Sequence, residues 1–96
     1  HVRDSVYCAY KEYQRSVRDE RYKLVEYVVD GRRTTQLFDL KADPWELDNL
    51  AADTAYSSDM ARLREEMIRW RGVSDDRQTE WGRIFWDGYE GSRCLP

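Results

Sequence analysis

The sequence predicts an α+β fold in which a small antiparallel sheet of about four strands packs against one long C-terminal helix. The first forty residues contain short runs rich in β-branched and aromatic side chains, which favour strands. Residues 54–71 contain no Gly or Pro and carry one apolar stripe at helical spacing. The whole chain, 96 residues and 11.6 kDa, is short enough that we expect a single domain, 1–96, with one modest core.

Four runs are expected to be strands: 5–10, 14–19, 22–29 and 32–40. The third is the strongest, because β-branched and aromatic residues fill it. It stops at Asp30-Gly31, the dipeptide that favours a two-residue type I′ turn. The third and fourth runs are therefore predicted to form a hairpin.

Both faces of this hairpin are partly apolar. One face carries Tyr22, Leu24, Val28 and Leu37, and the other carries Val25, Tyr27, Val29, Phe38 and Leu40. An antiparallel sheet with one face in water should instead alternate cleanly between apolar and polar residues. One helix covers only one face, and residues 77–89 could cover part of the other. We expect any remaining apolar surface to be an interface, through which the isolated chain forms a homo-oligomer, most simply a dimer.

The segment after the sheet predicts a turn and then the long helix. Asp43 is expected to cap a turn that begins at Pro44, and Asp53 is a plausible N-cap of the helix. Gly72 is predicted to end the helix. The core-facing stripe is Tyr56, Met60, Leu63, Met67 and Trp70. Arg69 lies off this stripe, so its replacement is expected to be nearly neutral.

Residues 73–96 are an aromatic-rich tail that the pattern does not place. The run Ser74-Asp75-Asp76 could cap a second short helix that holds Trp81, Ile84 and Phe85, although Gly82 and Gly88 weaken that prediction. The tail is too apolar to remain free, so we expect it to dock, with Trp81, Phe85, Trp86 and Tyr89.

Composition excludes several classes of protein. The net charge is −3, and residues 37–61 alone hold six acidic and one basic side chain, a balance of −5. This argues against a nucleic-acid partner, which would need a basic face. No apolar run approaches the roughly 20 residues of a spanning helix, so no membrane association is expected. The start at His1, without Met or a signal-peptide pattern, predicts a cut fragment or processed product.

The inventory of catalytic residues is small. His1 is the single histidine and stands at a chain end, so we expect it to have no catalytic role. Cys8 and Cys94 could form one disulfide that closes a long loop, but two free thiols are favoured, because the dense cysteine framework of small secreted domains is missing. These residues do not supply four zinc ligands.

Two further clusters have an alternative functional interpretation. The carboxylates Asp39, Asp43, Glu46 and Asp48 have the wrong spacing for a calcium loop and are better explained as turn and cap residues. The aromatic residues Tyr7, Tyr10, Tyr13, Trp45 and Trp86 could form a platform on which a sugar stacks. Core and interface packing is the more common role of such residues.

Two longer motifs resemble a known family. The segment 15–25, Arg-Ser-Val-Arg-Asp-Glu-Arg-Tyr-Lys-Leu-Val, resembles the R-x-V/I-R-x-x-R-Y-K-Y/L-I strand pair in the C-terminal subdomain of sulfatases. The segment 36–51, Gln-Leu-Phe-Asp-Leu-Lys-Ala-Asp-Pro-Trp-Glu-Leu-Asp-Asn-Leu-Ala, is similar to that family's E-L-Y-D-L-x-x-D-P-x-E-x-x-N-L-A. The resemblance covers about 15–72 and leaves residues 73–96 unmatched.

The resemblance implies a non-catalytic C-terminal fragment of a sulfuric ester hydrolase of the alkaline-phosphatase superfamily. In that family a formylglycine, made from the Cys or Ser of Cys/Ser-x-Pro-Ser-Arg, lies with calcium in a large N-terminal α/β domain. Cys8 is followed by Ala-Tyr-Lys-Glu and fails the motif. Cys94-Leu95-Pro96 matches three of its positions before the given sequence ends, but in the family the motif lies far upstream of the C-terminal subdomain, so this match is interpreted as chance. The resemblance therefore assigns no catalytic, cofactor-binding or metal residue here, and no residue of a substrate rim.

The implied partner is the catalytic domain of the same polypeptide, whose fold and pocket rim this fragment would complete. The alternatives are a free-standing carbohydrate-binding module and a self-associating interaction module. A preceding catalytic domain in the gene would favour the sulfatase interpretation over both.

Overall fold

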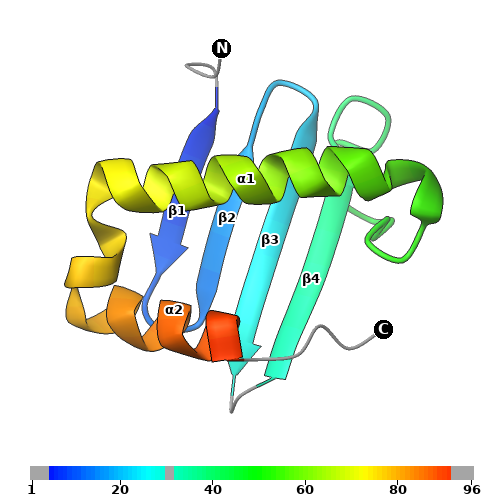
Figure 1. Ribbon diagram of the computed structural model, residues 1–96. Helices are drawn as coiled ribbons and strands as arrows, with labels where there is room; N and C mark the ends of the chain where they lie inside the picture. Colours follow the sequence, from blue (N-terminus) through cyan, green and yellow to red (C-terminus); the bar gives the residue numbers. More distant parts are fainter. Residues whose placement is uncertain (1–4, 30–31, 92–96) are drawn as a thin grey trace.

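Alternating side chains in the first forty residues build one antiparallel sheet. The computed structural model describes residues 5–29 and 32–91, and its four strands lie in the order β1-β2-β3-β4 (Figure 1). They are β1 (Val6–Tyr10), β2 (Gln14–Arg18), β3 (Tyr22–Val29) and β4 (Arg32–Asp39). The expected sheet of about four antiparallel strands is confirmed.

The predicted hairpin is the longest pairing in this sheet. β3 and β4 pair over eight positions, from Tyr22 opposite Asp39 to Val29 opposite Arg32. This register places Leu24 opposite Leu37, so both side chains point to the same face. The predicted turn at Asp30-Gly31 lies outside the described residues.

The long helix is confirmed, but its predicted end at Gly72 is wrong. The 3₁₀ turn η1 (Thr54–Tyr56) leads into α1 (Ser57–Ser74), and the Asp53 side chain accepts a hydrogen bond from the Ala55 N–H. Gly72 continues the helix, which costs only about 1 kcal/mol relative to Ala. The helix ends at Asp75, whose φ of 55° is left-handed and whose N–H bonds to the Arg71 carbonyl.

The long helix is not the only helix of the described chain, as the predicted fold had it, because the tail forms a second one. After the 3₁₀ turn η2 (Asp76–Gln78), α2 runs over Glu80–Gly91. The glycines that weaken its helix propensity permit close packing: a Cβ on Gly82 would lie 1.7 Å from the Asp76 carbonyl oxygen, and one on Gly88 2.8 Å from Val28 Cγ1. The close packing of α2 therefore outweighs the low helix propensity of its glycines.

Both helices lie across the same face of the sheet (Figure 1). The buried apolar core between the helices and this face consists of Val17, Leu24, Val28, Leu37, Leu63, Met67, Phe85, Trp86 and Tyr89. Of the predicted α1 stripe, Leu63 and Met67 are buried, while Tyr56, Met60 and Trp70 are half-buried at the margin of this core. The tail docks as expected, but Trp81 stays 52% exposed.

The second face of the sheet is not covered by residues 77–89, so that prediction is wrong. Strand alternation puts Val6, Tyr10 and Val29 on this face, and each is about half exposed. Val25 on β3 and Phe38 on the edge strand β4 point the same way and are buried. An exposed apolar margin therefore remains, and the expected interface there stays a prediction.

The segment between β4 and η1 adds a border to the sheet. Leu50 donates its N–H to the Leu37 carbonyl at 2.8 Å, and Asn49 Oδ1 accepts the Leu37 N–H at 3.0 Å. The Asp43 carboxylate accepts the N–H groups of Leu47 and Asp48, which confirms its predicted role as a turn cap. No helix within the described part of the chain is both long and apolar enough to cross a membrane.

Candidate functional site

Arg15 is a buried cation that the strand pattern itself places. It stands two residues before Val17 on β2, so both side chains point toward the helices. The Arg15 side chain is 1% exposed, and its guanidinium lies 4.7 Å from the centre of the Phe85 ring. Its Nη1 donates to the carbonyls of Lys11 and Gln14, both at 2.7 Å, and so fixes the β1–β2 turn.

The partner of this cation is Asp76, which the left-handed Asp75 turns back toward the sheet. Its Oδ2 accepts hydrogen bonds from Arg15 Nε at 2.5 Å, the Tyr7 hydroxyl at 2.6 Å and Trp86 Nε1 at 3.0 Å. Its Oδ1 accepts Arg15 Nη2 at 3.2 Å. One carboxylate thus joins β1, β2 and α2, and a buried charge so well paired is satisfied.

This network shifts two pKa values in opposite directions. Burial alone would raise the pKa of Asp76, but the hydrogen bonds from Arg15, Tyr7 and Trp86 outweigh burial and lower it below 3.8. Burial, and then the hydrogen bond to Asp76, raise the pKa of the Tyr7 hydroxyl well above its usual value. At neutral pH, Asp76 is therefore ionised and Tyr7 keeps its proton.

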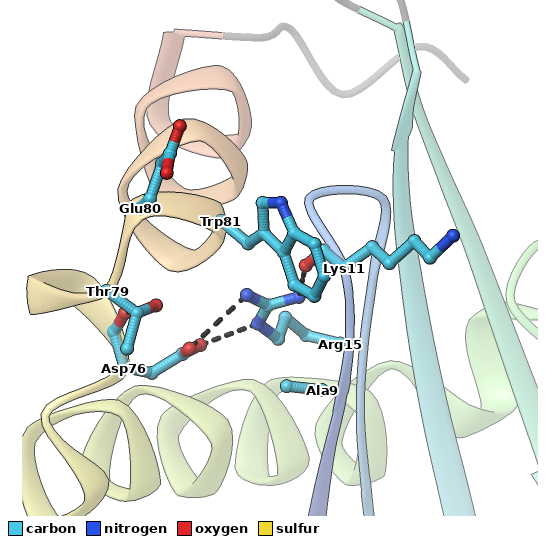
Figure 2. A pocket seen from close by; sticks show the side chains of 7 residues that line it. All are labelled: Ala9, Lys11, Arg15, Asp76, Thr79, Glu80 and Trp81. Carbon is cyan, nitrogen blue, oxygen red and sulfur yellow. Dashed lines mark hydrogen bonds and ion pairs between the residues drawn. The ribbon is translucent and has the colours of Figure 1, made fainter.

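A hollow of about 440 Å³ opens above the Arg15–Asp76 pair (Figure 2). It lies between the β1–β2 turn and the start of α2, and Figure 2 shows the Trp81 indole beside the Arg15 guanidinium. Lys11, at the tip of the turn, has a left-handed φ of 51° and is exposed. The lining residues are Ala9, Lys11, Arg15, Asp76, Thr79, Glu80 and Trp81.

This hollow offers binding groups. Trp81 supplies an exposed apolar ring and Glu80 a carboxylate. The Lys11 ammonium points away from the hollow (Figure 2) and lies 5.6 Å from the centre of the Tyr10 ring. The Thr79 hydroxyl already donates to the Asp76 carbonyl and accepts the Gly82 N–H. Such a surface can hold a small polar molecule with one flat apolar side, but it presents no activated nucleophile.

The aromatic residues that could have formed a sugar platform do not come together. Trp86 is fully buried, and the Tyr7 ring stacks on Trp70 with 6.3 Å between centroids. Tyr10, Tyr13 and Trp45 are exposed, on the β1–β2 hairpin and the turn after β4. The packing explanation therefore holds for Tyr7 and Trp86.

The acidic cluster is engaged in turns and ion pairs. Asp39 pairs with Arg21 at 3.1 Å, and Glu46 pairs with Lys23 at 3.1 Å. Within residues 5–29 and 32–91, no group of three or more His, Cys, Asp or Glu side chains is placed to hold a metal ion. Cys8 is an exposed free cysteine, while His1 and Cys94 lie outside the described residues.

Sequence reasoning missed the residues that form the hollow. The sequence did contain one indication of this site: Arg15 is a charged residue two positions before Val17, so strand alternation places it on the same, core-facing side. Its partner Asp76 lies 61 positions away, in the segment that had no predicted placement. Spacing alone does not reveal such a pair.

Comparisons with known proteins match this fold to one group of enzymes. The family model described as "N-sulphoglucosamine sulphohydrolase, C-terminal" matches residues 1–72. An ulvan-active sulfatase of Formosa agariphila is 32% identical over 73 residues, 75% of this chain and 12% of the relative. A multifunctional alkaline phosphatase superfamily protein, PehA, of Trinickia caryophylli is 38% identical over 61 residues, 64% of this chain and 11% of the relative.

Solved structures share the same architecture. A putative sulfatase from Bacteroides thetaiotaomicron superposes with a TM-score of 0.65 at 32% identity, over 78% of this chain and 17% of that one. A protein solved in complex with its substrate D-glucosamine-2-N,6-O-disulfate gives a TM-score of 0.70 at 23% identity. The match covers 77% of this chain and 16% of that one. That second likeness shows the fold alone.

Fold and comparisons together define the class: a C-terminal subdomain of sulfatases, within the alkaline-phosphatase superfamily. The chain belongs to the N-sulphoglucosamine sulphohydrolase C-terminal family. It spans only 12% and 11% of the lengths of the two curated relatives. Helix α2 lies beyond the family match, which ends at residue 72.

Proposed function

We propose that this chain is the non-catalytic C-terminal subdomain of a longer sulfatase, that it packs against the catalytic domain of the same polypeptide, and that it contributes to the rim of the substrate pocket. The observation that carries this proposal is the family match over residues 1–72, in a chain that spans about an eighth of its relatives. The parent protein would hydrolyse sulfate esters.

The family's formylglycine and calcium do not fit onto this chain. Cys8 lacks the Cys/Ser-x-Pro-Ser-Arg sequence, and the described carboxylates serve turns and ion pairs. Both groups would belong to the catalytic domain. Sulfate ester hydrolysis needs an activated nucleophile and stabilisation of developing charge, and this chain contributes neither.

The direct test uses the purified 96-residue chain. We expect no turnover of an aryl sulfate, with or without added calcium. Metal-dependent turnover that the substitution Cys94→Ser abolishes would contradict the proposal. The decisive genetic observation is a catalytic domain with Cys/Ser-x-Pro-Ser-Arg encoded upstream in the same reading frame.

The hollow beside Trp81 supports the rim part of the proposal. Its exposed indole suits a saccharide, since a sugar ring stacks on an aromatic face. In the longer polypeptide, Trp81→Ala should raise KM for a sulfated saccharide and leave kcat unchanged. Ile84→Ala removes an exposed apolar side chain of the same helix that does not line the hollow and should change neither value. Equal KM values in both variants would exclude the hollow from the rim.

A further inference from the structure

Two large apolar side chains stand almost fully in solvent after β4. Trp45 is 79% exposed and Leu47 is 80% exposed, the highest values among the large hydrophobic residues of the described chain. A single exposed apolar residue is ordinary on a protein surface. Two of them in one short turn, the segment 43–48, form a local apolar projection.

The backbone of this turn is held in place at several points. The Asp43 carboxylate accepts the Leu47 N–H at 3.1 Å and the Asp48 N–H at 2.9 Å, and the Asp43 carbonyl accepts the Glu46 N–H at 3.0 Å. Glu46 between the two apolar residues has a left-handed φ of 57°, an uncommon conformation for this residue type. The Lys23 ammonium holds its carboxylate at 3.1 Å. A turn fixed in this way presents Trp45 and Leu47 already positioned, which lowers the entropic cost of binding.

The turn itself is acidic. It carries Asp43, Glu46 and Asp48, of which Glu46 pairs with Lys23 from β3. Interfaces commonly place apolar residues at the centre and charges of complementary sign at the rim. The surface that fits this turn is therefore an apolar recess bordered by lysine or arginine.

The turn is continuous with the uncovered face of the sheet. Lys23 alternates with Leu24, so its side chain lies on the face away from the helices, and Glu46 pairs with it there. The helices occupy the other face (Figure 1). A partner that covers the free face can thus also enclose Trp45 and Leu47.

We propose that the 43–48 turn is a docking element, and that its occupant is an apolar recess with a basic rim on the catalytic domain of the same polypeptide. This proposal rests on the proposed function. The family model describes the C-terminal part of a larger enzyme, and the remaining length of the relatives supplies a domain large enough to carry such a recess.

The test compares one pair of substitutions in two settings. In the isolated 96-residue chain, the double variant Trp45→Ala/Leu47→Ala should leave Tm within about 2 °C, because both side chains are already in solvent. In the longer polypeptide, the same variant should lower the unfolding temperature of this subdomain by about 5 °C or more. Hydrogen exchange of the amides in 43–48 should rise by about tenfold.

The matched control is Ile68→Ala/Val73→Ala, which truncates two exposed apolar residues on α1. It should leave the unfolding temperature unchanged in both settings. The charge reversal Asp48→Lys should also lower that temperature in the longer polypeptide, and the loss should shrink at high salt, because a basic rim would repel the new lysine.

Three outcomes would overturn the docking proposal. The first is an active longer sulfatase in which Trp45→Ala/Leu47→Ala is silent, which leaves the proposed function intact. The second is a dimer of the isolated chain that this variant dissolves, which would assign the turn to a second copy. The third is a longer polypeptide without sulfatase activity or catalytic domain, which overturns the proposed function as well.

Discussion

The side chain of Asp76 connects three separate elements of the fold. Its carboxylate accepts hydrogen bonds from Tyr7 on β1, Arg15 on β2 and Trp86 on α2. A buried ion pair of this kind often contributes little net stability relative to an apolar pair, but it is costly to break. The network therefore specifies how the tail docks.

Loss of the Asp76 carboxylate should be severe. Asp76→Ala leaves Arg15 buried without its counter-ion, so we expect a loss of about 3–5 kcal/mol in the free energy of unfolding. Asp87→Ala is the control, because Asp87 forms an exposed ion pair with Arg77 that is worth about 1 kcal/mol at most. Chemical denaturation of both variants measures the difference. Similar midpoints would contradict the assigned role.

The same carboxylate should make stability depend on acid. Its folded pKa lies below its unfolded value of 3.8, so its contribution is present above about pH 4. That contribution is lost as the pH falls through the folded pKa. Asp19 and Asp39 also have lowered pKa values, so they too make the free energy of unfolding fall as the pH falls. Urea denaturation at a series of acidic pH values measures how the free energy of unfolding depends on pH. This dependence should be weaker for Asp76→Ala than for the unaltered chain. An equal dependence in both would show that Asp76 does not contribute to the acid sensitivity.

At the scale of elements, the strands were predictable and the helix ends were not. Alternation and the Asp30-Gly31 dipeptide reflect local chemistry, so they predicted the β3–β4 hairpin. The end of α1 depends instead on Asp76 meeting Arg15 across 61 positions. Because Asp also adopts left-handed φ, Asp75 ends the helix three residues after the glycine that the pattern favoured.

Two glycines in the helices should respond in opposite ways to alanine. Gly72 has open space at its Cβ position, so Gly72→Ala should stabilise the chain by about 0.5–1 kcal/mol. A Cβ at Gly82 would overlap the Asp76 backbone, so Gly82→Ala should displace α2 and destabilise the protein. Thermal unfolding of the two variants, followed by circular dichroism, tests both signs. A stable Gly82→Ala variant would contradict the packing of α2.

The apolar stripe of α1 can be tested at Trp70. The Trp70 ring stacks on Tyr7, and its Nε1 donates to Ser5 Oγ at 2.7 Å, but the side chain is only half-buried. We expect Trp70→Ala to cost about 3 kcal/mol, the lower end for such truncations. Arg69 is exposed as expected, yet it pairs with the buried Glu66 at 2.5 Å, so it is not the neutral control that the pattern implied.

Glu65→Ala is the better control for Trp70, because Glu65 is exposed on the outer side of α1. Its replacement should change the free energy of unfolding by less than about 0.5 kcal/mol. Equal losses from Trp70→Ala and Glu65→Ala, measured by urea denaturation, would mean that the orientation of α1 is wrong.

For the whole molecule, the uncovered sheet face predicts self-association of the isolated chain. Val6, Tyr10 and Val29 remain exposed there, and burial of such a patch stabilises a dimer. Light scattering after size exclusion at high micromolar concentration should show a dimer that dissociates on dilution. A monomer that binds no hydrophobic dye would contradict the prediction.

The arrangement of the core was only partly predictable, because, like the helix ends, it depends on contacts between residues far apart in sequence. Leu63 and Met67 follow from a local stripe, whereas Phe85 and Trp86 come from a segment whose glycines obscured its helix. The composition of the tail predicted that it docks, and only the three-dimensional contacts show that it shares a face with α1.

The contacts of β1 also bear on how the chain is made. Two hydrogen bonds of the first strand region join distant parts of the chain: Ser5, just before β1, bonds to Glu66 on α1, and Tyr7 on β1 bonds to Asp76 in η2, over 61 and 69 positions. The hairpins can form as soon as they leave the ribosome, since their partners are neighbours in sequence. The core closes only when α2 has been synthesised, so a nascent chain would carry an open sheet until Gly91 has been added. Completion of this subdomain is therefore a late step in its biosynthesis.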